Sequence, residues 1–234
     1  LSFIALSFCA SEQVVVANTP IVNKIIQERE VKNFNGIVVG GPINVVVDLG
    51  NTEKLRFEGD EEAIATLVVE VKGNVLIIRP KTSWRSWSSI YQNKKITAYI
   101  TAKTLKSLTL SGSGNIQVND LLDQADLTTT ISGSGNISAK IKASSFTGVI
   151  SGSGNLTIVG NANQADVNIS GSGSFGKKEF IAENMNAKIS GSGTINATVK
   201  KHLNALISGS GDINYNGDPS VDKKIVGSGK VRKM

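Results

Sequence analysis

Apolar and polar residues alternate with a period of two over most of the chain after residue 105. Counted by twos, one side of this alternation holds the apolar residues of two successive stretches: Leu108, Leu110, Ile116 and Val118, then Ile131, Ile137, Ala139 and Ile141. Successive side chains leave a β-strand on opposite faces, so this pattern is typical of strands with one buried face. We therefore predict an all-β protein.

A Ser-Gly-Ser-Gly motif, with small variations, returns regularly along this part of the chain. Its first glycines are Gly112, Gly133, Gly152, Gly171, Gly191, Gly209 and Gly227. The steps between them, by subtraction, are 21, 19, 19, 20, 18 and 18 residues. A repeat of this length with slightly variable spacing indicates a stacked array whose insertions lie in loops.

The period of two continues across each motif, in the pattern Ile-x-Gly-x-Gly-x-Ile. This parity places both glycines on the apolar side and the serines on the outer side. A glycine within a strand marks a sharp bend or a close backbone approach. We therefore predict a parallel β-solenoid, or β-helix, of about seven turns. Each strand continues through its glycines, both glycines point inward, and the coil bends inward there to form a corner at the same point of every turn. Six spacings of about 4.8 Å give a column about 29 Å tall.

The alternative is an array of antiparallel hairpins in which the motif forms the turns, because Gly with Asn or Ser favours hairpin turns. A hairpin turn does not require an even spacing between the apolar residues on its two sides, yet most copies of the motif keep one. The solenoid is therefore the preferred interpretation.

The part before the repeats is also rich in strand patterns but is less regular. We predict a strand whose inner face includes Phe34, Gly36 and Val38, and a hairpin around Gly73-Asn74. Asp60, followed by acidic residues, is typical of the N-cap of a short helix. The predicted organisation is a leader at 1–18, an irregular β-rich part at 19–105 and the repeat solenoid at 106–234.

The first ten residues resemble the apolar core and cleavage end of a signal peptide, so we predict export, with residues 11–30 forming a leader. Cys9 is the single cysteine, which leaves no intrachain disulfide and makes it a candidate lipid-attachment site. No later segment is long and apolar enough to span a bilayer as a helix.

Composition argues against several classes of function. The net charge of +6 is spread along the chain, and the repeats contain few aromatics, which disfavours nucleic-acid binding. One histidine, His202, and one cysteine cannot build a clustered metal site, so we predict no metal and no cofactor. The acidic residues between copies do not recur at a fixed distance from the glycines, as paired catalytic carboxylates on successive turns would.

Residues 79–95 interrupt the strand pattern with five positive charges and no acid, and they hold both tryptophans. A long loop of this kind is often functional. We predict a contact patch formed by Trp84, Arg85, Trp87 and Tyr91, since Trp and Arg are favoured interface anchors. The alternative is that the tryptophans fold back to close the end of the core.

A second candidate surface is a flat polar strip formed by the outward motif serines and the residues next in line: Asn115, Asn136, Asn155, Ser174, Thr194, Asp212 and Lys230. Small polar residues suit a tight corner that faces water. We prefer this structural interpretation of the strip. The alternative is a regular array that binds a repetitive ligand such as a glycan.

Several segments together resemble the putative auto-transporter adhesin, head GIN domain family of exported proteins found mostly in Bacteroidota. The resemblance rests on 34–39, 42–48, 55–60, 73–78 and the Ser-Gly-Ser-Gly-Asn-Ile copies, over roughly 200 residues. It implies a β-helical cell-envelope protein and supplies no catalytic residues.

We thus predict a non-catalytic module of the periplasm, outer membrane or cell surface that binds a glycan or a cell-surface protein, or acts as a scaffold. The alternative is a carbohydrate-active enzyme, a polysaccharide lyase or hydrolase, built on a β-helix. The oligomeric state is left open.

Overall fold

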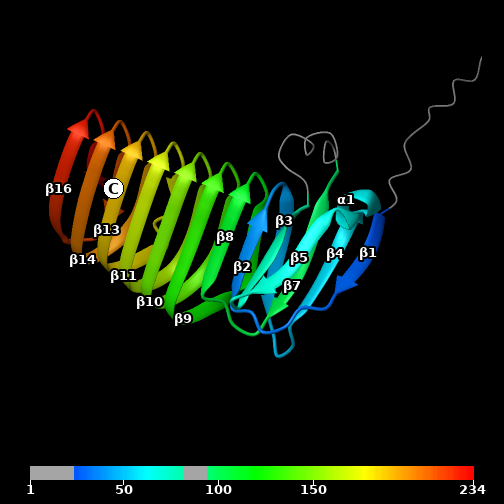
Figure 1. The fold of residues 1–234 in the computed structure, drawn as a ribbon. Coiled ribbons are helices and arrows are strands. Elements are labelled where there is room, and N and C mark those ends of the chain that lie inside the picture. Colours follow the sequence, from blue (N-terminus) through cyan, green and yellow to red (C-terminus); the bar gives the residue numbers. More distant parts are fainter. Residues whose placement is uncertain (1–23, 82–93) are drawn as a thin grey trace, which may run out of the picture.

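The computed structural model describes residues 24–81 and 94–234, which form a single 17-stranded sheet wound into a column with one short helix near one end (Figure 1). The elements before the repeats are β1 (Lys24–Arg29), β2 (Gly36–Gly40), β3 (Ile43–Leu49), β4 (Lys54–Asp60), α1 (Glu61–Ala65), β5 (Leu67–Lys72), β6 (Val75–Pro80) and β7 (Ile96–Ala102). The repeats contain β8 (Ser107–Gly112), β9 (Asn115–Gly133), β10 (Asn136–Gly152), β11 (Asn155–Gly171), β12 (Ser174–Phe175), β13 (Phe180–Gly191), β14 (Thr194–Gly209), β15 (Asp212–Asn216), β16 (Ser220–Gly227) and β17 (Lys230–Lys233).

Neighbouring strands in the repeat part are parallel and in register. Along one column, Gly133 pairs with Gly152 and Gly152 with Gly171, and the isoleucines two residues earlier pair in the same way. About seven coils, roughly 19 residues apart, therefore stack like on like. The predicted solenoid is confirmed, and the antiparallel hairpin alternative is wrong.

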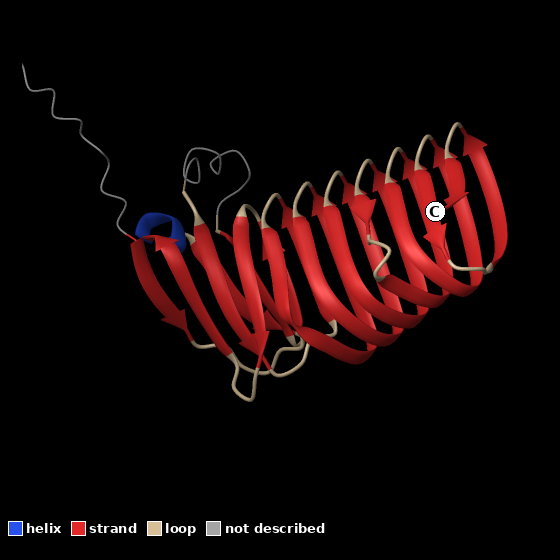
Figure 2. Cartoon of the chain, turned by 180° about the vertical axis from the view of Figure 1, so that it is seen from behind, coloured by secondary structure: helices blue, strands red, loops and turns tan. Residues whose placement is uncertain are grey.

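Each coil turns sharply at its Ser-Gly-Ser-Gly motif, and these corners line up along one edge of the column (Figure 2). The prediction that the strand continues through the motif was wrong, because β9 ends at Gly133 and β10 begins at Asn136. All seven first glycines have positive φ, between 121° and 132°. A residue with a side chain rarely adopts this conformation, so the bend itself selects glycine.

The two glycines of a motif face different neighbours. A Cβ on Gly152 would lie 2.5 Å from the carbonyl oxygen of Gly133 in the next coil, so this half-exposed glycine is needed for backbone stacking. A Cβ on the buried Gly154 would lie 2.6 Å both from the Gly135 oxygen and from Cγ2 of Ile131 inside the column. The prediction that both glycines point inward therefore holds only for the second.

The corners divide the surface of the column into two faces, which meet again at wide bends along the opposite edge (Figures 1 and 2). Face A is formed by the segments that follow each corner, including β3 and the first halves of β9, β10 and β11. Face B is formed by the segments that precede each corner, including β2, β8 and the second halves of the same long strands.

The stack continues past the first motif into the N-terminal part. β2 pairs in parallel with β8, and β3 with β9, while Gly41 makes backbone hydrogen bonds with Ser111 and Gly114 at the corner between them. On the other side of this coil, β6 pairs with β2 and β7 with β3. Antiparallel strands then close this end: β5 pairs with β6, β4 pairs with β7, and β1 pairs with β4.

Three local predictions for this part can be compared with the structure. The hairpin around Gly73-Asn74 is confirmed, as is the helix, whose N-cap Asp60 accepts from the Ala63 N–H. The predicted inner face of 34–40 is confirmed at Phe34 and Gly36, which are buried, but it was wrong at Val38. Ile37 and Val39 are fully buried, whereas Val38 is half-buried. The N–H groups of Asn35 and Gly36 both donate to the Asn74 carbonyl, and the bend there shifts the parity by one residue. Strand β1 also lies where a leader was predicted.

In the part of the chain that the structure describes, the interior of the column is lined by apolar side chains, with Thr129 as a fully buried polar residue. In its middle, Phe146, Phe175 and Phe180 form a cluster with ring centroids 5.2 to 5.9 Å apart. Because each coil buries its inner face only against its neighbours, the stacked coils share one continuous core.

Candidate binding face

The side chains that the sequence singled out most strongly lie outside the residues that the structure describes. Trp84, Arg85, Trp87 and Tyr91 fall within 82–93, and Cys9 falls within 1–23. The contact patch and the lipid-attachment site therefore stay predictions. The surface features described below all belong to residues 24–81 and 94–234.

Part of the predicted polar strip forms a continuous ladder of side-chain hydrogen bonds on face A. The Nδ2 group of Asn115 donates to Oδ1 of Asn44 at 2.7 Å, and Asn136 donates to Asn115 at 2.7 Å. Asn155 donates to Asn136 at 2.8 Å, and the Ser174 hydroxyl donates to Asn155 at 2.6 Å. We call these five residues the amide ladder. Thr194, Asp212 and Lys230 follow them in register.

The local sequence explains why these amides meet. Each ladder residue follows its corner directly, and the in-register stack places it about 4.8 Å from its counterpart. A carboxamide has two N–H donors and an oxygen with two lone pairs, so a ladder bond on each side leaves one N–H and one lone pair per residue for a ligand. Sequence reasoning missed Asn44, because it lies 71 residues before Asn115 and follows a Gly-Gly-Pro corner without the repeat motif.

Beside the ladder, a shallow hollow of about 370 Å³ opens on face A. Its outward side chains are mostly uncharged hydrogen-bonding groups, from Gln117, Asn119, Ser138 and Thr157, with Lys140 at one side. We call this the amide hollow. Gln117, Ser138 and Thr157 pair in register across β9, β10 and β11, so their side chains form a second row parallel to the ladder.

A second hollow of about 410 Å³ lies on the same face toward the N-terminal end. Tyr99 of β7 and Arg56 of β4 contribute to its lining, and the guanidinium carbon of Arg56 lies 4.4 Å from the centre of the Tyr99 ring. We call this the Tyr99 hollow. Glu53 also borders it, but its side chain is only 6% exposed and is held by the backbone N–H groups of Asn33 and Phe34. Glu53 is therefore a structural anchor of the loop before β2.

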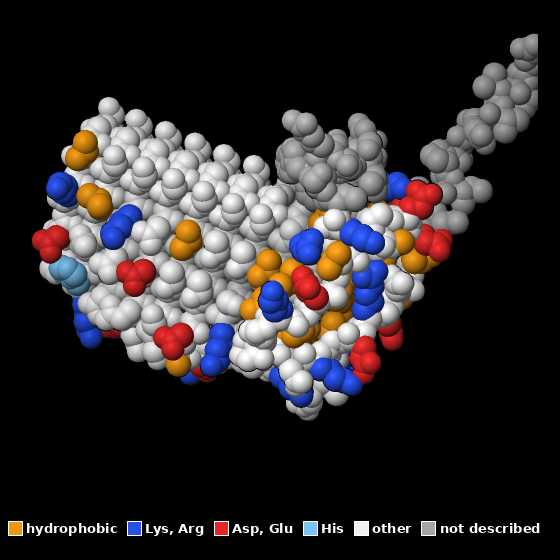
Figure 3. Space-filling model, viewed as in Figure 1, with side chains coloured by type: hydrophobic (Ala, Val, Ile, Leu, Met, Phe, Trp, Pro, Cys, Tyr) orange, Lys and Arg blue, Asp and Glu red, His pale blue; other side chains and the backbone are white. Residues whose placement is uncertain are grey.

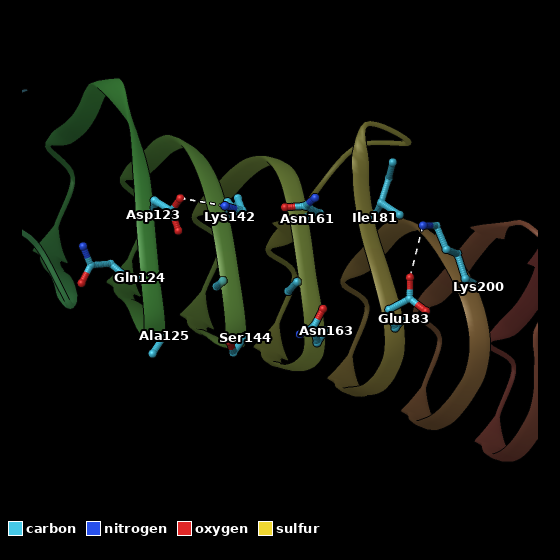
Figure 4. A pocket seen from close by; sticks show the side chains of 12 residues that line it. Asp123, Gln124, Ala125, Lys142, Ser144, Asn161, Asn163, Ile181, Glu183 and Lys200 are labelled. Atoms are coloured by element: carbon cyan, nitrogen blue, oxygen red, sulfur yellow. Dashed lines mark hydrogen bonds and ion pairs between the residues drawn. The ribbon is translucent and has the colours of Figure 1, made fainter.

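The hollow at the wide bends, also about 410 Å³, contains the acidic groups that could suggest catalysis (Figure 4). Asp123 pairs with Lys142 at 2.9 Å, and Glu183 pairs with Lys200 at 3.2 Å. Hydrogen bonds from Lys201 and Lys200 lower the pKa of the Glu183 carboxyl, so it stays ionised at neutral pH. The two acids stand three coils apart, about 14 Å at 4.8 Å per coil. Paired glycosidase carboxylates lie about 5 to 9.5 Å apart.

The single histidine, His202, lies on the half-exposed surface of β14. Its Nδ1 lies 2.8 Å from the Ser220 hydroxyl, and its Nε2 lies 3.5 Å from an oxygen of Asp222. The Ser220 hydroxyl donates to the Lys201 carbonyl, so it accepts a hydrogen bond from His202. This is the wrong direction for a serine activated by a histidine base.

Charge is unevenly distributed over face B. Figure 3 shows that the row of corners in the repeat part is free of charged side chains over most of its length, whereas charged side chains lie nearer the wide bends and over the N-terminal part. Among the residues that the structure describes, no group of three or more acidic, histidine or cysteine side chains could hold a metal ion. None of the helices in residues 24–81 and 94–234 could cross a membrane.

Comparison with known proteins identifies the family. The profile of the family described as "Putative auto-transporter adhesin, head GIN domain" matches residues 33–219, which confirms the resemblance inferred from the sequence. No curated protein matches the chain at a significant level.

Solved structures share the fold over nearly their whole length. An adhesin of Bacteroides fragilis, described as putative, is 24% identical, with a TM-score of 0.79 over 90% of this chain and 97% of its own. A protein of Parabacteroides distasonis described as a "putative lipid binding protein" is 25% identical, with a TM-score of 0.72 over 91% and 97%. A third, from Parabacteroides merdae and also described as a putative adhesin, is 22% identical, with a TM-score of 0.65 over 90% and 96%.

Proposed function

Because this chain belongs to the putative auto-transporter adhesin, head GIN domain family, we propose that it is an exported, non-catalytic module of the cell envelope or surface that binds its partner through face A. The observation that carries this proposal is the amide ladder together with the adjoining amide hollow. These features present fixed donors and acceptors on a rigid stack of strands.

The rigidity of the ladder is the reason to regard it as a recognition surface. Side chains that are held in place before a partner arrives lose less conformational entropy on binding. Each ladder amide is positioned by its neighbours in the coils above and below, while its remaining donor and acceptor face solvent. A face of this kind can bind polar groups without first being ordered.

The alternative, a carbohydrate-active enzyme, has less support. The acids of the wide-bend hollow are engaged by lysines and are too far apart to act as a general acid and its partner. The family and the related structures carry the descriptions adhesin and lipid binding, and neither description names a reaction.

The proposal is tested by changing one face while leaving the other intact. In the face A variant, Gln117→Glu, Ser138→Lys and Thr157→Glu place alternating charges along three paired positions, so that cross-strand neighbours attract. The matched control is Thr130→Glu, Val149→Lys and Asn168→Glu, which has the same charges in the paired positions of the same strands on face B. Urea unfolding shows whether both variants keep the stability of the parent.

Labelled parent and variants are applied to an array of polysaccharides, matrix proteins and envelope lipids. We expect parent binding to at least one class, loss of at least about tenfold in the face A variant, and little change in the control. Equal effects of the two variants, or no binding by the parent, would contradict the proposal. Cell fractionation followed by protease shaving of intact cells tests the predicted export.

A further inference from the structure

We propose that face A is a track for a linear, uncharged polysaccharide that lies along the column axis and reaches both the amide hollow and the Tyr99 hollow. This inference rests on the proposed function, since it names the ligand class and its orientation on the same face.

Three parallel rows of side chains run along this face. The central row crosses six strands in register: Arg56, Tyr99, Val46, Gln117, Ser138 and Thr157. On one side lies the amide ladder, which Thr97 continues toward the N-terminal end by pairing with Asn44. On the other side, Thr101 pairs with Asp48, whose carboxylate accepts a hydrogen bond of 2.8 Å from Asn119.

The chemistry of the rows matches that of a sugar chain. A pyranose ring has apolar C–H faces and a rim of hydroxyl groups, each both a donor and an acceptor. Tyr99 and Val46, both half-buried, provide an apolar step in the central row against which a ring face can pack. The flanking amides, hydroxyls and Asp48 carboxylate provide donors and acceptors at the height of the ring hydroxyls.

The two hollows set the direction of the ligand. The central row runs from β4, through β7, β3, β9 and β10, to β11, which is five strand spacings or about 24 Å. The rows run across the strands and therefore along the column. A ligand that follows them contacts both hollows at once, whereas a ligand lying along one strand contacts a single coil.

The central row favours an uncharged chain, and the charged residues that line the Tyr99 hollow are of both signs in equal number: Glu28, Glu30, Glu53, Arg29, Lys54 and Arg56. From Tyr99 to Thr157, the central row holds no charged residue across five strands. Arg56, at one end, is occupied by the Tyr99 ring and pairs in the sheet with Glu28. An anionic polymer binds through a series of Lys and Arg side chains, and such a series is absent from this central row.

The experiment measures binding of defined sugars to the full chain by calorimetry. The probes are a disaccharide and an octasaccharide from a neutral β-glucan, the same pair from a neutral mannan, and a polygalacturonate octasaccharide. For at least one neutral series, we expect the octasaccharide to bind at least about tenfold more tightly than the disaccharide, because it reaches both hollows. We expect polygalacturonate to bind more weakly, and the affinity for the neutral chain to change little between low and high salt.

Two sets of substitutions locate the bound chain. The face A variant described above, at the amide hollow, and Tyr99→Val, at the other hollow, should each weaken octasaccharide binding at least about fivefold. The face B control should change it less than twofold. Tyr99→Val keeps a residue that favours strands, so loss of folding does not confound the result.

The failures of the two proposals can be told apart. Tighter binding of polygalacturonate, or no gain from length in either neutral series, overturns the neutral axial track. If neutral sugars do not bind but the face A variant loses another ligand on the array, the track is wrong and the binding function stands. If the face A variant and the face B control behave alike for every ligand, both proposals fail.

Discussion

The repeat part and the N-terminal part belong to the same sheet but are held together in different ways. In the repeat part, like residues stack on like: glycine on glycine, isoleucine on isoleucine, asparagine on asparagine. In the N-terminal part, contacts join unlike residues that are distant in sequence, as when Arg29 of β1 donates to the carbonyls of Ile64 and Leu67. The first mode propagates a structure, and the second closes its end.

The difference matters because a stack of identical coils has no internal signal to stop. Its open edge presents unpaired backbone groups that can recruit another strand. The antiparallel strands β1, β4 and β5, with α1 beside them, change the strand direction at the N-terminal end of this sheet.

The largest effect is expected from a corner glycine of the repeat part. Gly152→Ala should lower the free energy of unfolding by about 3 kcal/mol or more, because the new Cβ meets the Gly133 carbonyl oxygen while φ is also unfavourable. The matched control is Gly73→Ala in the β5–β6 hairpin, where φ is also positive but no atom lies within 4 Å of the new Cβ. We expect a loss of about 1 to 2 kcal/mol there. Urea unfolding measures both, and equal losses would show that backbone stacking is not what selects glycine at the corners.

At the closing end, Arg29→Ala should lower the free energy of unfolding by about 2 kcal/mol, since it removes two hydrogen bonds to partly buried carbonyls and the contact with the Phe57 ring. Hydrogen exchange should increase in β1 and α1 and stay unchanged in β10 and β11. Faster exchange throughout the column would mean that the end and the repeats unfold as one unit. Arg29→Lys, which keeps one donor group and the charge, should recover part of the loss.

The contribution of Glu53 to the stability of the N-terminal part depends on pH. Burial raises the pKa of its carboxyl, but hydrogen bonds from the Asn33 and Phe34 N–H groups and the charge of Lys103 lower it by more, so the net pKa lies below its ordinary value. A lowered folded-state pKa contributes stability above the unfolded pKa, about 4.3, and this contribution disappears as the pH falls through the folded value.

The Glu53→Gln variant should therefore be about 1 to 2 kcal/mol less stable than the parent at pH 7. The gap should narrow as the pH falls below about 4. Urea unfolding of parent and variant across pH 3 to 7 checks this expectation, and a gap that does not change with pH would exclude the carboxylate as its source.

The smallest effect is expected in the amide ladder. Asn136→Ala removes its bonds to Asn115 and Asn155, but these groups are exposed and water replaces the lost partners, so we expect a loss of about 0.5 to 1 kcal/mol. Ser138→Ala, two residues along the same strand, is the control and should change stability less. A loss above about 2 kcal/mol would make the ladder a main source of column stability rather than a surface feature.

The same contrast decides how much of the molecule the sequence could predict. In the repeat part, the alternation around Gly133 and Gly152 predicts which residues pair between neighbouring coils, because each coil is a copy of its neighbour. In the N-terminal part, alternation identified strands but not their partners. Nothing local to 34–40 indicates that two N–H groups bend toward Asn74, and this bend is what places Ile37 and Val39 inside.

On the candidate binding face, too, the residues of the repeat part could be predicted and those of the N-terminal part could not. The ladder residues after each motif could be predicted as a strip, because they share one position in the repeat. Asn44, Tyr99 and Arg56 could not, since their places on face A depend on β3 pairing with β9 and β7, and on β4 pairing antiparallel with β7. Pairings between segments so far apart in the chain leave no trace in local periodicity.

The like-on-like stacking of coils also makes the length of this protein adjustable. A duplicated copy of 136–154, inserted after itself, would lie between its parent and the coil that begins at Asn155, on the in-register backbone pairing that β10 already makes with β11. Each such duplication would extend the column by about 4.8 Å and add one more strand segment to face A. Duplication of the corresponding gene segment can therefore lengthen the column in steps of one whole coil.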